Sequence, residues 1–204
     1  MLLSGGIDSA TALYLTKSKT DVRALTFVYH GIARKELDSA KALGSGAGLL
    51  EHRVVRLPDL REAGDITGFK LRGLPPSYIP VRNGIFYSFA ASYAEETGAD
   101  LIVGGHHRDD RKVFDDASPE FFGTLEAALR IGSPVLRRNR VSISLPLSKM
   151  SKVEVVGLGA SLGVPFELTW SCHRDRRKHC WRCQGCATRK TAFQSAGVED
   201  PLMR

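Results

Sequence analysis

The sequence has no long hydrophobic run, and nothing in its 204 residues approaches the roughly 18 consecutive apolar residues of a membrane-spanning helix. The first residues, MLLSGG, hold neither a basic segment nor a long apolar one, so no signal peptide is expected. Hydrophobic residues make up 43% of the chain and charged residues 25%, which excludes wholesale disorder. We therefore expect a globular cytoplasmic protein without a membrane partner, built as one domain or as one domain with a small appendage.

Cysteine is scarce, and its few copies lie close together. Cys172, Cys180, Cys183 and Cys186 are the only 4 cysteines of the chain. A disulfide-stabilised secreted domain would spread its cysteines through a small chain. Four thiolates instead complete a tetrahedral shell for Zn²⁺, and pairs separated by two residues let two sulfurs converge on one ion. We expect a structural zinc site, with an iron–sulfur cluster or four clustered reduced thiols as the alternatives.

An excess of acidic residues is also absent. Lysine and arginine number 29 against 22 aspartates and glutamates, which gives a formal net charge of +7. Such a balance attracts anions, among them nucleotides, tRNA and anionic membrane surfaces. Much of the positive charge lies in residues 136–140 and 173–178, which we interpret as two solvated basic loops. No RRM, KH or helix-turn-helix signature is present, so nucleic acid is not a required partner.

Short apolar segments alternate with amphipathic ones along the chain. Strand patterns cover residues 2–3, 22–29, 52–57, 101–103 and 141–144, and helix patterns cover 9–17, 36–43, 83–97, 121–131 and 153–162. Gly98 is expected to end its helix as a C-cap, and residues 64–80 are expected to form a Gly/Pro-rich loop over a site. This alternation predicts an α/β fold with a mainly parallel sheet and helices on both faces. We expect a nucleotide-binding domain over residues 1–167 and a zinc-binding segment over 168–204.

The glycine-rich segment near the start lacks the lysine of a Walker A loop. It consists of Leu3, Ser4, Gly5, Gly6, Ile7, Asp8 and Ser9, after an apolar start and before a helix. Glycines let backbone approach an anion, and a helix N-terminus presents unpaired N–H groups with positive dipole charge. Asp8 fits beside phosphates when Mg²⁺ or a ribose engages it. The segment predicts a pyrophosphate-binding loop, the alternative being an ordinary Ser/Gly turn.

Residues 4–9 resemble the SGGxDS loop of the PP-loop ATP-pyrophosphatase superfamily. Within it, the chain is similar to the 7-cyano-7-deazaguanine (preQ0) synthases almost from end to end. The similarity includes Phe27 and Tyr29, Arg34 and Glu36, residues 78–86 (YIPVRNGIF), residues 145–147 with Lys152, and the cysteine segment through residue 201. The resemblance implies a Rossmann-like fold of the adenine nucleotide α-hydrolase type and a homodimer.

The same resemblance implies an activity and a set of site residues. It is the ATP-driven ligation of 7-carboxy-7-deazaguanine with ammonia through adenylylated intermediates, ending in a nitrile, with Mg²⁺ accompanying ATP. Asp8, Ser9 and Lys152 are the expected catalytic residues. Arg82, Asn83, Phe86 and Asp116 are the expected substrate residues, with Asp116 accepting from the exocyclic amine and ring N–H of the base. His106 and His107 are equally compatible with proton transfer and with ordinary polar roles at a strand end.

Departures from the family pattern keep other acceptors open. Residues 114–118 (FDDAS) replace a YPDCR segment, and residues 30–33 (HGIA) replace GQRH. One alternative is a relative that joins a deazapurine to another amine, such as a protein terminus. A tRNA thiolating or lysidine-forming enzyme and a zinc-ribbon nucleic-acid binder are the other two. Thiolation needs a sulfur-carrying cysteine, and the metal site would use every cysteine of the chain.

Overall fold

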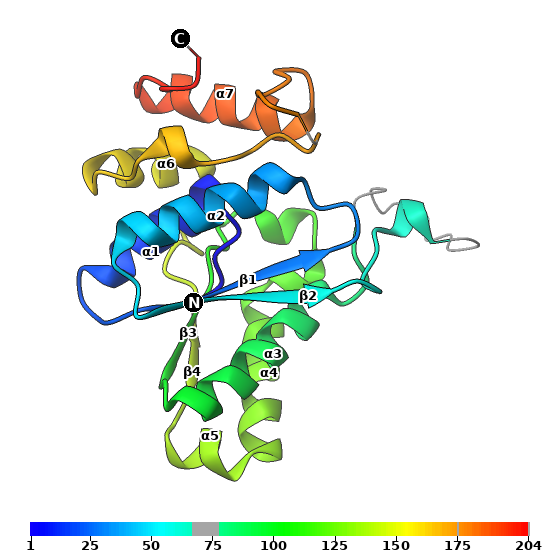
Figure 1. Ribbon diagram of the computed structural model, residues 1–204. Helices are drawn as coiled ribbons and strands as arrows, with labels where there is room; N and C mark the ends of the chain where they lie inside the picture. Colours follow the sequence, from blue (N-terminus) through cyan, green and yellow to red (C-terminus); the bar gives the residue numbers. More distant parts are fainter. Residues whose placement is uncertain (67–77, 175, 204) are drawn as a thin grey trace.

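The computed structural model describes residues 1–66, 78–174 and 176–203 (Figure 1). In chain order its helices and strands are α1 (Ile7–Lys17), β1 (Arg23–Tyr29), α2 (Arg34–Ala47), β2 (Glu51–Leu57), α3 (Arg82–Thr97), β3 (Leu101–Val103), α4 (Pro119–Gly132), α5 (Pro134–Arg138), β4 (Ser142–Ser144), α6 (Lys152–Ser161) and α7 (Gln184–Ala196).

The N-terminal residues connect two parallel pairs of strands, β1 with β2 and β3 with β4. Leu3 N–H donates to the Leu25 carbonyl of β1 at 2.8 Å, and Leu2 N–H donates to the Val103 carbonyl of β3 at 2.9 Å. The backbone order across the molecule is therefore β2, β1, residues 1–3, β3, β4. Residues 4–9 consequently emerge in the middle of the carboxyl edge, where open α/β sheets bind ligands.

Helices cover both faces of the strands, as the alternating pattern predicts (Figure 1). On one face α1 and α2 lie against the strands, and α6 and α7 are stacked outside them; α3, α4 and α5 cover the other face. One apolar core joins β1 to α3 through Leu25 and Tyr87. A second joins α1, α6 and α7 through Ile7, Val155 and Phe193, and two smaller clusters lie beside them. Burying such a side chain contributes about 1.5–3 kcal/mol each.

The expected strands and helices after residue 6 are confirmed with shifts of a few residues at their ends, whereas residues 2–3 form only an isolated bridge between Leu2 and Leu25. Gly98 ends α3 in the left-handed conformation, with φ of 71° and its N–H on the Ala94 carbonyl. The expectation of a loop at residues 136–140 was wrong in part. Pro134–Arg138 forms helix α5, because Ser133 caps it and Leu136 is buried in the core. Most of the expected loop at residues 64–80 lies outside the described residues.

Helix α7, which the sequence patterns did not predict, packs on α6 and ends in a left-handed Gly197. Its Arg189 is fully buried and makes two hydrogen bonds with Asp200, at 2.7 and 2.8 Å. Arg189 also donates to the Thr169 hydroxyl and the Phe166 carbonyl. This residue therefore ties α7 to the chain end and to residues 166–169. The division at residues 167 and 168 stays a prediction.

None of the helices within the described residues is long and apolar enough to cross a membrane.

Candidate active site and metal centre

Residues 4–9 form a tight loop at the start of α1. The Ser9 hydroxyl donates to the Gly6 carbonyl at 3.1 Å and accepts from the Ser4 backbone N–H at 3.2 Å. The two serine hydroxyl oxygens are 3.1 Å apart, and Gly6 N–H points to Ser4 Oγ at 3.4 Å. Helix α1 begins at Ile7 without a side-chain cap, so the N–H groups of its first turn remain available to an anion.

Two glycines let neighbouring backbone pack against this loop. Gly5 has φ of +85°, and a Cβ there would come within 2.8 Å of the Ala40 backbone nitrogen in α2. A Cβ on Gly105, just beyond β3, would lie 2.9 Å from the backbone nitrogen of Ser9. Any larger residue would push α2 or the segment after β3 away from the loop.

Asp8 links the loop to α6. Lys152 at the start of α6 donates to Asp8 Oδ2 at 2.5 Å, across 144 positions of sequence. A capping box of Ser151 and Glu154 fixes the first turn of α6, and with it the backbone of Lys152. Asp8 Oδ1 is buried without a hydrogen-bond partner among the described residues. Because an unpaired buried carboxylate oxygen is costly, this atom suits a cation that arrives with the ligand.

A cavity of about 410 Å³ opens at this edge of the strands. It is lined by eight of the predicted site residues: Leu3, Ser4, Gly6, Asp8, Ser9, Arg82, Asn83 and Phe86. Lys152 reaches the cavity wall through Asp8. Gly5 supports the loop from behind, and Ile7 is buried in the core of α1 and α6. Segments far apart in sequence thus come together around one space.

Asp116 lies beside the cavity but does not line it. Its Oδ2 accepts the Asn83 backbone N–H at 3.1 Å, and the buried Asn83 amide donates to the Asp116 carbonyl at 2.8 Å. Both residues thereby hold the first turn of α3 to residues 115–117. The role of Asp116 as the carboxylate that contacts the base stays a prediction.

Arg82, Tyr29 and Glu36 form a group of ionisable residues on the cavity wall. Burial raises the pKa of Glu36 to about 7, against the opposing effect of Arg82 and with a smaller contribution from Glu62. Burial likewise raises the pKa of Tyr29 to about 12. The Arg82 guanidinium also lies 5.8 Å from the ring centroid of Phe114. Arg82 therefore stands between an aromatic ring and a carboxylate that is only partly ionised near neutral pH.

His106, His107 and Asp110 follow β3 on the other side of the loop. The Asp110 carboxylate accepts the His107 backbone N–H at 2.9 Å and lies 3.8 Å from His106 Nδ1. Burial raises the pKa of Asp110, whereas burial and the nearby Arg82 lower the pKa of His106 to about 4. His106 is therefore a neutral hydrogen-bonding group at physiological pH.

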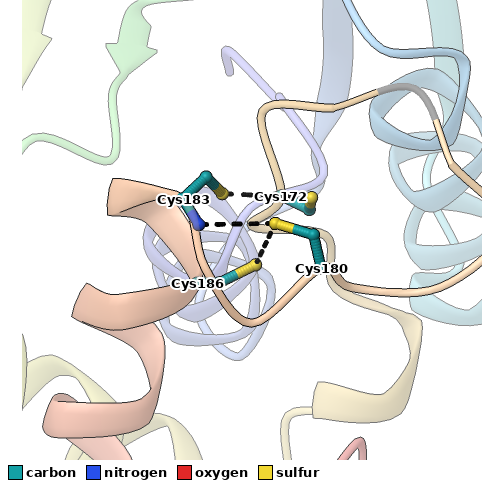
Figure 2. A group of neighbouring side chains, drawn as sticks. All are labelled: Cys172, Cys180, Cys183 and Cys186. Carbon is teal, nitrogen blue, oxygen red and sulfur yellow. Dashed lines mark hydrogen bonds between the residues drawn. The ribbon is translucent and has the colours of Figure 1, made fainter.

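The four cysteines come together at the start of α7 (Figure 2). Their sulfur atoms all lie within 4.8 Å of one another, with 3.9 Å between Cys180 and Cys186 and 3.9 Å between Cys172 and Cys183. A tetrahedral zinc ion with Zn–S bonds of about 2.3 Å separates its sulfurs by about 3.8 Å. Backbone N–H groups of residues 182 and 183 lower the pKa of Cys180 to about 6. The cluster can therefore hold a metal ion, as its spacing predicts.

The segment before the cysteines contacts the loop of residues 4–9. Trp170 N–H donates to the Gly5 carbonyl at 2.9 Å, and Trp170 also lines the cavity. Its indole N–H donates to the Cys172 carbonyl at 2.7 Å, and its ring packs on His179. The metal centre and the cavity thus share one side chain.

Sequence reasoning did not assign Glu36, Asp110 or Trp170 to the cavity. Glu36 was named only as part of the family resemblance, and Asp110 was not singled out. A signal for both was available, because each follows a predicted strand and the carboxyl ends of parallel strands meet at one edge.

Comparison with known proteins gives this geometry a context. The family model described as queuosine biosynthesis protein QueC matches residues 1–197. The 7-cyano-7-deazaguanine synthase of Trichodesmium erythraeum is 37% identical to this chain, with 100% of the chain and 98% of the relative covered. The enzyme of the same name from Thermoplasma acidophilum is 35% identical, with 99% and 90% covered.

Two solved structures share the fold. The NMN synthetase of Francisella tularensis aligns with a TM-score of 0.55 and 18% identity, over 97% of this chain and 76% of its own. The U34-tRNA thiolase NcsA of Methanococcus maripaludis, solved with its [4Fe-4S] cluster, aligns with a TM-score of 0.53 and 19% identity. This alignment covers 95% of this chain and 62% of the thiolase chain. At these identities the likeness concerns the fold alone.

Proposed function

The chain belongs to the QueC family of queuosine biosynthesis proteins, and from that premise we propose that it is an ATP-dependent ligase producing 7-cyano-7-deazaguanine. Its substrates would be 7-carboxy-7-deazaguanine, ammonia and ATP. The observation that supports this most is the cavity at the carboxyl edge, where the phosphate loop and the Arg82–Phe86 segment share one space.

The proposed reaction uses two activations. A carboxylate oxygen attacks the α-phosphorus of ATP and pyrophosphate leaves; ammonia then attacks the carbonyl carbon, loses a proton and expels AMP to give the amide. The amide oxygen attacks a second ATP in the same way. Loss of both remaining N–H protons then expels the second AMP and forms the nitrile. Both carboxylate oxygens leave within AMP, so the reaction needs no water and releases none.

The residues of the loop would contribute position and charge. The first-turn N–H groups of α1 and the hydroxyls of Ser4 and Ser9 would hold phosphate oxygens of ATP. Lys152, already directed at Asp8, would place a positive charge beside the departing pyrophosphate. Such pre-oriented donors stabilise developing charge without reorganising during the reaction.

Mg²⁺ fits the donor set at Asp8. Its Oδ1 is buried and unpaired among the described residues, and carboxylate oxygens together with ATP phosphates are the usual ligands of this ion. When bound, the ion would neutralise the phosphate charge near a carboxylate that otherwise repels it.

We further propose that the metal held by the cysteines is zinc with a structural role. All four thiolates are used, which leaves no open coordination position for a substrate. The same observation disfavours a thiolase, because the sequence has no fifth cysteine to carry sulfur. A homodimer and a cytoplasmic location remain parts of this proposal.

Product analysis tests the proposed function. The enzyme with ATP, ammonia and carboxyl-¹⁸O-labelled 7-carboxy-7-deazaguanine should yield the nitrile, pyrophosphate and AMP carrying the label. ADP and phosphate as products, or label released into water, would contradict the mechanism. If no nitrile forms and an amine other than ammonia is consumed, the result would favour a related ligase with a different acceptor.

A further inference from the structure

The cavity contains two separate groups of ionisable side chains. Asp8 and Asp110 act on each other and on Lys152 beside the phosphate loop. Glu36 and Arg82 act on each other and on Tyr29. His106 lines the same cavity, and both Arg82 and Asp8 influence its pKa. The first group fits phosphates and a cation, which leaves the second without a role in the proposed reaction.

Glu36 is the unusual member of the second group. It is partly buried in the first turn of α2 and lines the cavity, yet no hydrogen bond or ion pair joins its carboxylate to another described residue. The neighbouring cation is Arg82. A carboxylate only accepts hydrogen bonds and a guanidinium only donates them, so the cavity wall presents acceptors and donors side by side.

This pattern matches one edge of a guanine-type base. That edge carries a carbonyl oxygen that accepts, followed by a ring N–H and an exocyclic amine that both donate. Adenine offers an amine that donates and a ring nitrogen that accepts, so it would place its acceptor against the carboxylate.

We propose that Glu36 and Arg82 together recognise this edge of the deazaguanine substrate and exclude adenine from its place. Glu36 accepts from the ring N–H and the exocyclic amine, and Arg82 donates to the carbonyl oxygen. The proposal rests on the proposed function and names the residues that select the base. Phe86, stacked on Phe27 with centroids 4.2 Å apart, supplies a flat apolar wall beside them.

The other carboxylates near the cavity are less suited to this task. Asp116 does not line the cavity, and its Oδ2 is occupied by the Asn83 backbone N–H. Asp110 is occupied by the His107 backbone N–H and faces two histidine rings. Asp8 is paired with Lys152 at the phosphate loop.

Equilibrium binding to the whole protein tests the assignment. Calorimetry would compare wild type with Glu36→Gln, using three compounds: 7-carboxy-7-deazaguanine, the same molecule without its exocyclic amine, and a non-hydrolysable ATP analogue. Glu62→Gln is the matched control, because Glu62 influences the charge of Glu36 but lies outside the cavity lining.

Wild type should bind the amine-bearing base more tightly than the base without the amine. Glu36→Gln should lower the affinity for the amine-bearing base by about 10- to 100-fold and abolish this preference, because glutamine offers one acceptor oxygen instead of two. Affinity for the ATP analogue should stay unchanged in both variants, as should base affinity in Glu62→Gln. The proposal would be overturned if Glu36→Gln bound the ATP analogue more weakly than wild type does, or if this variant still preferred the amine-bearing base.

Two further outcomes have to be distinguished from these: a Glu36→Gln variant that does not fold, and a wild-type protein that does not bind the bases. If Glu36→Gln does not fold, wild type alone decides, because equal affinity for the two bases would exclude recognition through the amine. If wild type binds neither base, the proposed function fails together with the inference. A third outcome separates the two. If wild type binds and converts the base, but Glu36→Gln prefers the amine-bearing base as strongly as wild type does, the inference is contradicted and the proposed function is not.

Discussion

The metal centre and the cavity are assembled in opposite ways. The four cysteine ligands come from one stretch, Cys172 to Cys186, and each sulfur lies within 4.8 Å of the others. The cavity draws its walls from the N-terminal loop, β1, α2, α3, the segment after β3 and Trp170. It also holds buried polar atoms that have no hydrogen-bond partner among the described residues, namely Asp8 Oδ1 and the Tyr87 hydroxyl. The first site is closed and complete, whereas the second is open and needs a ligand.

This difference suggests a division of labour between stability and chemistry. A closed thiolate shell contributes folding free energy once metal binds. Unpaired buried groups cost free energy in the empty protein, a cost that a ligand can relieve. Changes at the cysteines and at Arg189 should therefore act on folding, whereas changes at Asp8 should act mainly on binding and turnover, and changes at Glu36 on both binding and stability.

The largest expected effect follows the opening of the metal shell. Cys183→Ser removes one of four thiolates, and structural zinc binding is worth on the order of 10 kcal/mol. We expect loss of zinc, an unfolded segment around α7 and loss of ATP binding, because Trp170 couples that segment to Gly5. Metal analysis, circular dichroism and calorimetry measure these. Ser195→Ala, an exposed change on α7, is the control. A soluble and fully active Cys183→Ser protein would refute the structural role.

The buried Arg189–Asp200 pair should have the next largest effect. Arg189→Met leaves the buried Asp200 carboxylate without its cationic partner and with the Leu202 backbone N–H as a remaining donor, which should lower the free energy of unfolding by about 3–5 kcal/mol. The double variant Arg189→Met with Asp200→Leu should recover much of that loss, because no charge stays buried. Denaturant unfolding of the three proteins measures both steps. A double variant as unstable as the single one would show that the pair acts through its geometry instead.

The cysteine cluster and the loop of residues 4–9 could be predicted from sequence as candidate sites, because each is local. The cysteine spacing and the order Ser4, Gly5, Gly6, Asp8, Ser9 describe a site within a few residues. Lys152 could be named only through the family resemblance, since it reaches Asp8 across 144 positions. Helix α5 was missed because the buried Leu136 is followed at once by the basic run Arg137, Arg138 and Arg140, which is typical of a solvated loop.

Asp116 and Glu36 illustrate the limit of local reasoning. Asp116 stands in a matched motif, yet its side chain faces the backbone of Asn83. Glu36 lies in the first turn of α2, where an acidic residue is ordinary. Only the tertiary fold, which brings the first turns of α2 and α3 to the same edge of the strands from opposite faces, places it in the same cavity as Arg82. Pairings of this kind depend on tertiary contacts that no short pattern contains.

Turnover should depend on Asp8 without a matching change in stability. Asp8→Ala removes the acceptor of Lys152 and the free oxygen proposed for Mg²⁺, so we expect a rate lower by about 100-fold or more. The melting temperature should change little, because the loss of the Lys152 ion pair is offset by removal of the buried Oδ1, which has no partner among the described residues. Asp38→Ala on exposed α2 surface is the control. A folded Asp8→Ala protein with wild-type rate would remove this residue from the mechanism.

The stability of the empty enzyme should reveal Glu36 through its pH dependence. Burial raises the folded pKa from 4.5 to about 7, with Arg82 opposing and Glu62 and Tyr29 nearby. A raised folded pKa means that stability is fully present below pH 4.5 and falls as the pH rises through about 7. Glu36→Gln should therefore be more stable than wild type at pH 8, by about 1–3 kcal/mol, and equal at pH 4. Denaturant unfolding of both proteins between pH 4 and pH 8 measures this difference. A Glu36→Gln protein less stable than wild type at pH 8 would contradict the prediction.

The smallest effect should come from substitutions of Asp116. These variants also distinguish Asp116 from Glu36 as the carboxylate that recognises the base. Asp116→Ala removes the acceptor for the Asn83 N–H at the start of α3, a contact comparable to a helix cap worth about 1 kcal/mol. Asp116→Asn keeps an oxygen in the same place and should restore most of that stability. Since Asp116 acts on the cavity only through Asn83, both variants should change the KM values for base and ATP to a similar, small extent. A KM that rises for the base alone in Asp116→Asn, with Glu36→Gln silent, would return base recognition to Asp116.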